Sequence, residues 1–304
     1  MKNQFHIHKL LALATIYFAL LLGAANAQDE GKEKDLRPIK NTFESTWLID
    51  NQSVDVPFKG TFQFDILHRF GVLGNGYSDF WGLYANSNIR LGFHYVPVEK
   101  LMIGFGLTKT NITWDINAKY AILRQARMGG SPVSLTYFGN MAFDTRDQEV
   151  GQFANKTDRY SYFHQLILAR KFSDQFSMQV AGSLSHFNAV EAYTTPENTV
   201  EGKLKNDHYA LAFSAKYKVI DWINVIVNYD QPLTKHNLEE VDPYANFSFG
   251  LELTSSSHQF QIFVGNYSGI IPQRNNVFNR NKFSFDEEDG GILIGFNMTR
   301  LWNF

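Results

Sequence analysis

Hydrophobic and polar residues alternate with a period of two along most of the chain from Phe58 onward. In residues 58–66 the even-numbered positions are apolar or glycine, and the odd-numbered positions are polar. Residues 113–122 and 247–253 show a similar alternation. Because successive side chains of a strand point to opposite faces, this pattern predicts strands that each have one apolar face.

About twelve segments of this kind follow one another along the chain. Most are roughly ten residues long, the length that a tilted strand needs to cross a membrane. We therefore predict strands at 58–69, 86–96, 100–109, 113–124, 133–143, 159–171, 175–187, 206–218, 222–231, 245–254, 258–267 and 291–304.

The connections between these segments largely alternate between short and long. Long connections fall at 70–85, 144–158, 188–205, 232–244 and 268–290. This alternation is typical of a membrane barrel with turns at one rim and loops at the other. Two connections depart from it: 110–112 is short where a long loop is expected, and 125–132 is long for a turn.

A sheet that displays many Phe, Ile and Leu side chains must bury that face in lipid or against another sheet. In hydrocarbon every backbone N–H and C=O needs a partner, so a spanning sheet has to close. We predict an all-β protein with a single transmembrane antiparallel up-and-down β-barrel. The alternative is a soluble β-sandwich or a secreted barrel with an apolar interior. Aromatic residues near strand ends fit interfacial girdles: Tyr95, Tyr120, Trp222, Tyr267 and Trp302.

The N-terminus has the three parts of a secretory signal peptide. Lys2 and Lys9 precede the apolar run 10–22, and small residues at 25–27 form a cleavage site near Ala27. The run is shorter than the ~20 residues that a membrane helix needs. We expect residues 28–41 to be a flexible periplasmic lead-in, too short for a plug domain, and residues 42–304 to form the barrel. Residues 42–49 are either an additional strand or a periplasmic flap.

Composition narrows the class of protein further. The net charge of −2 does not suggest the excess of positive charge that is typical of nucleic-acid-binding proteins. Mean hydropathy is −0.26, which argues against a helical membrane protein, whereas a barrel exposes only alternate residues to lipid. The chain has no cysteine, which excludes disulfides and thiolate metal sites.

The last predicted strand ends on an aromatic residue. Counted back from Phe304, one face carries Trp302, Met298 and Phe296, interrupted only by Arg300. This pattern resembles the C-terminal signal by which outer-membrane barrels are recognised for assembly. We expect Phe296, Trp302 and Phe304 to form this signal, and the barrel assembly machinery and outer-membrane lipid and lipopolysaccharide to be partners.

Several short motifs occur in a characteristic order. They are His68-Arg69-Phe70-Gly71, Asn88-Ile89-Arg90-Leu91-Gly92, Lys119-Tyr120 with Leu123-Arg124-Gln125, and Gly295-Phe296-Asn297 with Arg300. In these motifs the chain resembles a membrane-bound β-barrel family, domain of unknown function 5777, of Gram-negative outer membranes. The resemblance covers roughly residues 42–304. It implies a barrel in the outer membrane and no particular activity.

Catalytic and metal-binding patterns are weak. Ser183 and His186 differ in strand parity, which argues against a hydrolase in the barrel wall, and the histidines are scattered over different segments. We expect no catalytic residue, no cofactor and no metal. The acidic run 286–289 fits a solvated loop, with Ca²⁺ binding as the alternative.

The inward face is the more informative one for function. Strand parity turns nine charged side chains toward the lumen: Lys59 and the eight candidate lumen-lining residues Asp65, Arg69, Arg90, Asp115, Lys119, Lys216, Asp230 and Glu252. These groups either line a narrow water path or pair with one another in a closed interior. The strand number does not decide between the two, because twelve lies between the eight strands of barrels filled by side chains and the sixteen or more of barrels with a channel. The leading hypothesis is a passive channel for an unidentified small solute. The alternatives are a non-conducting structural or adhesion barrel acting through its loops and, third, a barrel-wall lipid hydrolase.

Overall fold

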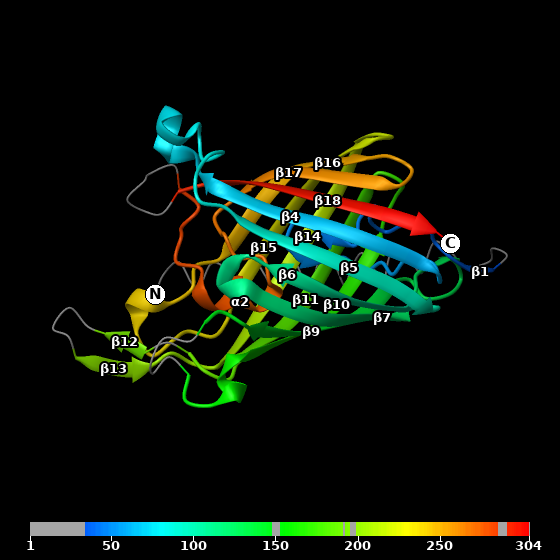
Figure 1. The fold of residues 1–304 in the computed structure, drawn as a ribbon. Helices are drawn as coiled ribbons and strands as arrows, with labels where there is room; N and C mark the ends of the chain where they lie inside the picture. The colour runs from blue at the N-terminus through cyan, green and yellow to red at the C-terminus, as the bar shows by residue number, and fades with distance from the viewer. Residues whose placement is uncertain (1–33, 148–152, 191, 195–198, 285–290, 304) are drawn as a thin grey trace, which may run out of the picture.

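A computed structural model describes residues 34–147, 153–190, 192–194, 199–284 and 291–303. Its main element is a closed barrel of twelve antiparallel strands (Figure 1). The strands are β4 (Thr61–Val72), β5 (Asn88–Val98), β6 (Leu101–Thr108), β7 (Thr113–Leu123), β9 (Ser134–Asp144), β10 (Tyr160–Lys171), β11 (Phe176–Phe187), β14 (Asp207–Ile220), β15 (Ile223–Pro232), β16 (Asn246–Thr254), β17 (His258–Gly265) and β18 (Leu293–Asn303).

Each wall strand pairs with its neighbour along the chain, and β18 closes the ring against β4. The closing ladder runs from Leu293 opposite Val72 to Asn303 opposite Thr61. The predicted fold class and the count of twelve strands are confirmed. The weakly alternating segment at 159–171 is β10, which pairs along its length with β9 and β11. No helix among the described residues is long and apolar enough to span a membrane.

Residue parity sorts the side chains of the wall. In β7 the even positions, including Trp114, Ile116 and Tyr120, are exposed on the outside, while Asp115 and Lys119 are buried inside. In β18 the odd positions 293–299 are buried and the even positions face outward. This arrangement follows from the period of two, and it places the apolar face of the wall where lipid would lie.

The two rims differ as the lengths of the connections predict. The two connections that departed from the pattern have structural explanations. A short 3₁₀ turn, η2 (Thr110–Ile112), joins β6 to β7, and the long turn after β7 contains β8 (Ala126–Met128). Strand β8 pairs with β1 (Asp35–Pro38) outside the barrel, so this part of the expected flexible lead-in is a strand. The predicted signal peptide, the acidic run 286–289 and Phe304 lie outside the described residues.

Residues 42–55 lie inside the barrel. This N-terminal insert contains a small hairpin of β2 (Trp47–Leu48) and β3 (Asn51–Gln52), and its residues 46–54 are at most 8% exposed. Residues 42–49 are therefore neither a wall strand nor a flap. Their residue pattern does not show this position, because the insert is buried by the barrel around it and not by a sheet of its own.

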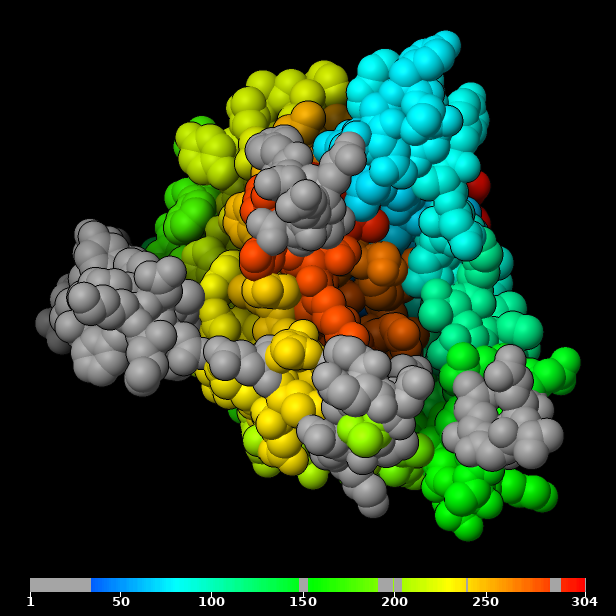
Figure 2. Space-filling model, turned by 90° about the vertical axis from the view of Figure 1, so that its left-hand side faces the viewer, coloured from blue at the N-terminus to red at the C-terminus, as the bar shows by residue number. Residues whose placement is uncertain are grey.

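A second insert enters from the opposite rim. The longest loop, between β17 and β18, carries the short helix α2 (Pro272–Phe278), of which Gln273, Asn275, Asn276 and Val277 are buried. Figure 2 shows the long-loop rim end-on, with the orange residues of this loop in the middle of the ring. The barrel is thus occupied from both ends.

Candidate functional site: the filled lumen

The eight candidate lumen-lining residues are all buried, at most 4% exposed. Lys59, which parity also placed inward, is exposed, because the first wall strand begins only at Thr61. Two of the eight form a closed pair, since the Arg90 guanidinium binds the Asp115 carboxylate through two hydrogen bonds of 2.8 Å. Glu252 accepts hydrogen bonds from Asn224 and Gln261 on neighbouring strands. Burying a charge costs free energy unless the charge is paired or hydrogen-bonded. For Arg90, Asp115 and Glu252, side chains of the wall strands provide these partners. That these residues line a solute path stays a prediction.

The other charged residues bind the N-terminal insert. Lys119 Nζ donates hydrogen bonds to the backbone carbonyls of Thr46, Ser53 and Asp55, at 3.1 to 3.2 Å. Lys216 Nζ lies 3.1 Å from the Glu44 carboxylate. Two lysines of the wall therefore hold the two ends of the insert.

The middle of the insert is held by further polar groups of the wall. Trp47 Nε1 donates to Asp65 at 2.9 Å, and Asn51 Nδ2 donates to Asp230 at 2.8 Å. Arg69 lies over the Phe263 ring and donates to the carbonyl of Ile49. Polar side chains of the wall donate hydrogen bonds to further backbone carbonyls of the insert: Thr136, Gln179, Asn228, Gln261 and Asn297.

The two inserts meet at Asp50. Its carboxylate accepts a hydrogen bond of 2.7 Å from the hydroxyl of Tyr267 and one of 3.4 Å from Asn275 Nδ2 of α2. Tyr267 is therefore a buried lumen residue, and its predicted place in an interfacial girdle is wrong. Tyr95, Tyr120 and Trp222 are exposed on the outside of the barrel, as predicted for girdle residues.

Side chains of the wall also fasten α2. Gln273 Nε2 donates to Asn140 and Ser161, both at 3.1 Å, and His236 Nε2 lies 3.0 Å from the carbonyl of Val277. These contacts were not predictable from the sequence, because α2 lies in the longest loop and its Asn and Gln side chains resemble those of any solvated loop.

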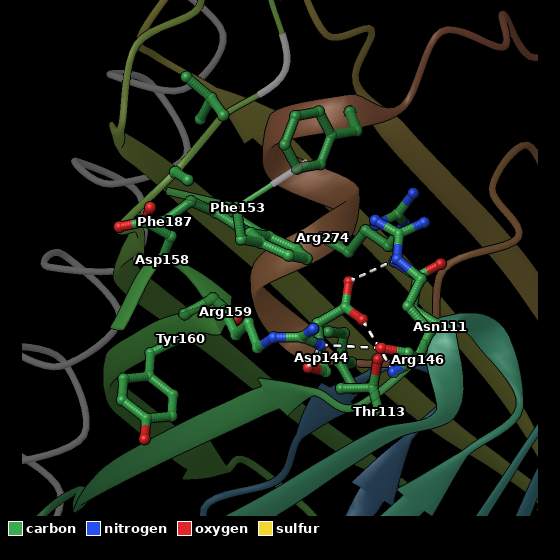
Figure 3. Close-up of a pocket in the computed structure, with 15 residues that line it drawn as sticks. Asn111, Thr113, Asp144, Arg146, Phe153, Asp158, Arg159, Tyr160, Phe187 and Arg274 are labelled. Carbon is green, nitrogen blue, oxygen red and sulfur yellow. Dashed lines mark hydrogen bonds and ion pairs between the residues drawn. The ribbon is translucent and has the colours of Figure 1, made fainter. Parts of the chain in front are cut away.

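A small pocket opens beside α2 at the long-loop rim (Figure 3). Its volume is about 120 Å³, and three guanidinium groups line it, from Arg146 and Arg159 of the β9–β10 connection and Arg274 of α2. Arg159 donates to the carbonyls of Asp144 and Arg146 and lies 4.7 Å from the centre of the Phe153 ring. The carboxylate of Asp144 lies 3.1 Å from Arg146 Nε.

The serine and histidine considered for a hydrolase in the barrel wall, Ser183 and His186, are not brought together. Ser183 and Ser185 are buried inside the barrel, whereas His186 binds Asp207 at 2.7 Å with part of its side chain exposed. No three His, Asp or Glu side chains of the described part of the chain gather as metal ligands would. The chemistry of the lumen is hydrogen bonding and ion pairing.

The closed ring of outward apolar and inward polar faces defines a transmembrane β-barrel. The chain belongs to the family described as a membrane-bound β-barrel domain, domain of unknown function 5777, whose model matches residues 43–302. The resemblance noted in the sequence is thereby confirmed.

Solved structures with a similar fold include three outer-membrane proteins. The NanC porin has a TM-score of 0.48 at 7% identity, covering 80% of this chain and 99% of that one. The COG4313 outer membrane channel from Pseudomonas putida F1 has a TM-score of 0.46 at 10% identity, covering 82% and 97%. The KdgM porin has a TM-score of 0.43 at 11% identity, covering 80% and 99%. A search of curated proteins found no match.

Proposed function

We propose that this protein is an outer-membrane channel for small polar solutes, closed in the present conformation by two removable inserts. The supporting observation is the way the N-terminal insert is held. Its backbone is bound by Lys119, Asn228 and other polar side chains of the wall, in addition to the apolar contacts that its buried Phe43, Trp47, Leu48, Ile49 and Val54 make inside the barrel.

Polar contacts of this kind can be exchanged for water. A hydrogen bond contributes only ~0.5–1.5 kcal/mol net, because water competes for both partners. If the insert left, Lys119, Gln179 and Asn297 would face a wet lumen at modest cost. The Arg90–Asp115 pair would remain closed without the insert. The polar part of the inward face therefore suits both a filled and a water-lined barrel, whereas the apolar contacts of the insert favour the filled one.

The outer pocket favours an anionic solute. Three guanidinium groups face two carboxylates, those of Asp144 and Asp158, so positive charge prevails. Guanidinium groups bind carboxylates and phosphates in a bidentate manner. Since Arg274 belongs to α2, an anion bound here would contact the helix that fills the outer mouth.

Conductance in planar bilayers tests the proposal. The wild-type barrel should stay mostly closed, whereas a variant with residues 42–55 replaced by a Gly-Ser linker of equal length should show frequent discrete openings. In the opened variant, Arg159→Gln should reduce the preference for anions measured from the reversal potential in a salt gradient. If the linker variant shows no conductance although heat-modifiable gel mobility shows that its barrel is folded, the channel proposal is contradicted.

A second candidate is a non-conducting structural or adhesion barrel. The observation in its favour is that the lumen is filled from both rims, while the hairpin of β12 (Ala192–Thr194) and β13 (Val200–Lys203) projects from the long-loop rim. If the barrel works in this way, deletion of residues 188–205 should abolish a surface interaction and leave assembly intact. The linker variant should then remain silent.

A further inference from the structure

The connection between β4 and β5 exposes an unusual concentration of aromatic side chains. We call residues 77–84 the aromatic loop. Tyr77 and Tyr84 are 80% and 82% exposed, and Phe80, Trp81 and Leu83 are also exposed. Single apolar residues on a surface are ordinary, but a contiguous exposed patch marks an interaction site.

The aromatic loop has a defined internal structure. The Phe80 ring lies 5.3 Å from that of Trp81 and 5.7 Å from that of Tyr84, centre to centre. Asp79 accepts hydrogen bonds of 2.7 Å from Asn75 Nδ2 and from the N–H of Gly82. The single carboxylate of the aromatic loop therefore faces inward onto its own backbone, and the rings face outward.

The backbone is strained in a way that favours this exposure. Phe80 and Trp81 both have φ near 55°, in the left-handed region that bulky residues rarely adopt. Gly82 packs closely on the end of β4, where a Cβ atom would lie 2.5 Å from the carbonyl carbon of Gly71. Strained backbone of this kind persists where the surrounding structure holds it, and it often accompanies function.

The position of the aromatic loop indicates its partner. It follows β4 (Thr61–Val72), whose outward face is lipid-facing, and in both views the cyan segment stands out sideways from the ring at the long-loop rim (Figures 1 and 2). A segment that leaves a membrane barrel sideways at its rim meets the surface of the same membrane. Tyr and Trp prefer this interface, because they combine an apolar ring with a polar group.

We propose that the aromatic loop lies in the headgroup region of the outer leaflet beside the barrel, as a lateral membrane contact. This membrane contact does not depend on whether the barrel conducts solutes. Between residues 73 and 85 only Asp79 is charged, and it is bound internally, so insertion leaves no unpaired charge. The contact would fix the depth of the barrel on the side of β4 and β5.

Site-directed spin labelling tests the proposal, because the chain has no cysteine of its own. A nitroxide at Tyr84→Cys in proteoliposomes should collide more often with oxygen, which enriches in lipid, than with a water-soluble nickel chelate. The matched control is Lys156→Cys, an exposed position in η3 (Lys156–Arg159) at the same rim. There the nickel chelate should dominate.

The same profile at both positions, with nickel dominant, would overturn the proposal. Protection from both reagents at Tyr84→Cys would also overturn it, and would indicate a protein partner or a second copy. Tyr77→Cys provides a second site within the aromatic loop if the Tyr84 variant does not assemble, and heat-modifiable mobility verifies the folded barrel in each case.

Discussion

At the scale of single residues, Lys119 shows how the wall holds the N-terminal insert. One fully buried ammonium group binds three backbone carbonyls, which lie before and after the hairpin of the insert. Such a contact replaces the β-ladder that the insert lacks. The inward direction of Lys119 was predictable from parity, whereas its partners were not, because they are backbone atoms of a segment far away in the sequence.

We therefore expect Lys119→Met to loosen the insert and to leave the wall intact. Hydrogen bonds to charged groups contribute ~1.5–3 kcal/mol, so the free energy that holds residues 42–55 in the lumen should fall by about 3 kcal/mol. Faster amide hydrogen exchange at 42–55 measures the effect. Lys109→Met, which removes an exposed lysine outside the lumen, is the control and should leave these amides unchanged.

His236 should make the fastening of α2 depend on pH. Its Nδ1 accepts the N–H of Lys205 and its Nε2 lies against the carbonyl of Val277, which requires a neutral ring. Burial, the largest cause, lowers the pKa of His236 from its usual 6.5. Lys205 and Arg280 also lower the pKa of His236, whereas Asp242 and the Val277 carbonyl raise it. The His208 ring lies 4.4 Å from that of His236, centre to centre.

A lowered pKa means that the stability contribution is complete above about pH 6.5 and is lost as the pH falls through the folded pKa. Amide exchange of residues 272–278, corrected for intrinsic rates, should therefore accelerate between pH 7.5 and pH 5. In a His236→Gln variant this pH dependence should be much weaker. An equally steep dependence in that variant would assign the effect to another group.

At the scale of elements, the wall and the inserts differ in what the sequence reveals. Each wall strand has an apolar outer face and a polar inner face, so its period of two is determined by lipid on one side and lumen on the other. The insert at 42–55 has no such constraint. Its hairpin has two residues in each strand, and it is held by Gln179, Asn228 and Asn297, which come from distant strands. Alternation therefore predicted the wall and missed the insert.

The last strand yields a prediction about assembly. Phe296 and Trp302 lie on the outward face of β18, where a recognition factor could contact them before closure against β4. We expect deletion of Phe304 together with Trp302→Ala to lower the assembled fraction several-fold, measured by heat-modifiable mobility of membrane protein. Trp222→Ala, at an exposed tryptophan outside the last strand, is the control. Equal losses in both variants would indicate a general lipid effect.

At the scale of the whole molecule, the two inserts form one connected filling. The N-terminal insert enters from the short-turn rim and α2 from the long-loop rim, and Asp50 touches both the Tyr267 hydroxyl and Asn275. Neither insert can leave the lumen without breaking the hydrogen bonds that Asp50 accepts from Tyr267 and Asn275. Opening at one rim should therefore favour opening at the other.

A double-mutant cycle on Asp50 and Tyr267 measures this coupling. In the channel proposed above, Asp50→Ala and Tyr267→Phe should each raise the open fraction in planar bilayers, because each removes one partner of the 2.7 Å hydrogen bond. The double variant should open little more than either single one, with an interaction energy of about 1–3 kcal/mol. Effects that add to within about 0.5 kcal/mol would show that the inserts move separately. If opening is coupled, binding of an anion to Arg274 that moves α2 out of the lumen would also loosen the N-terminal insert at the other rim.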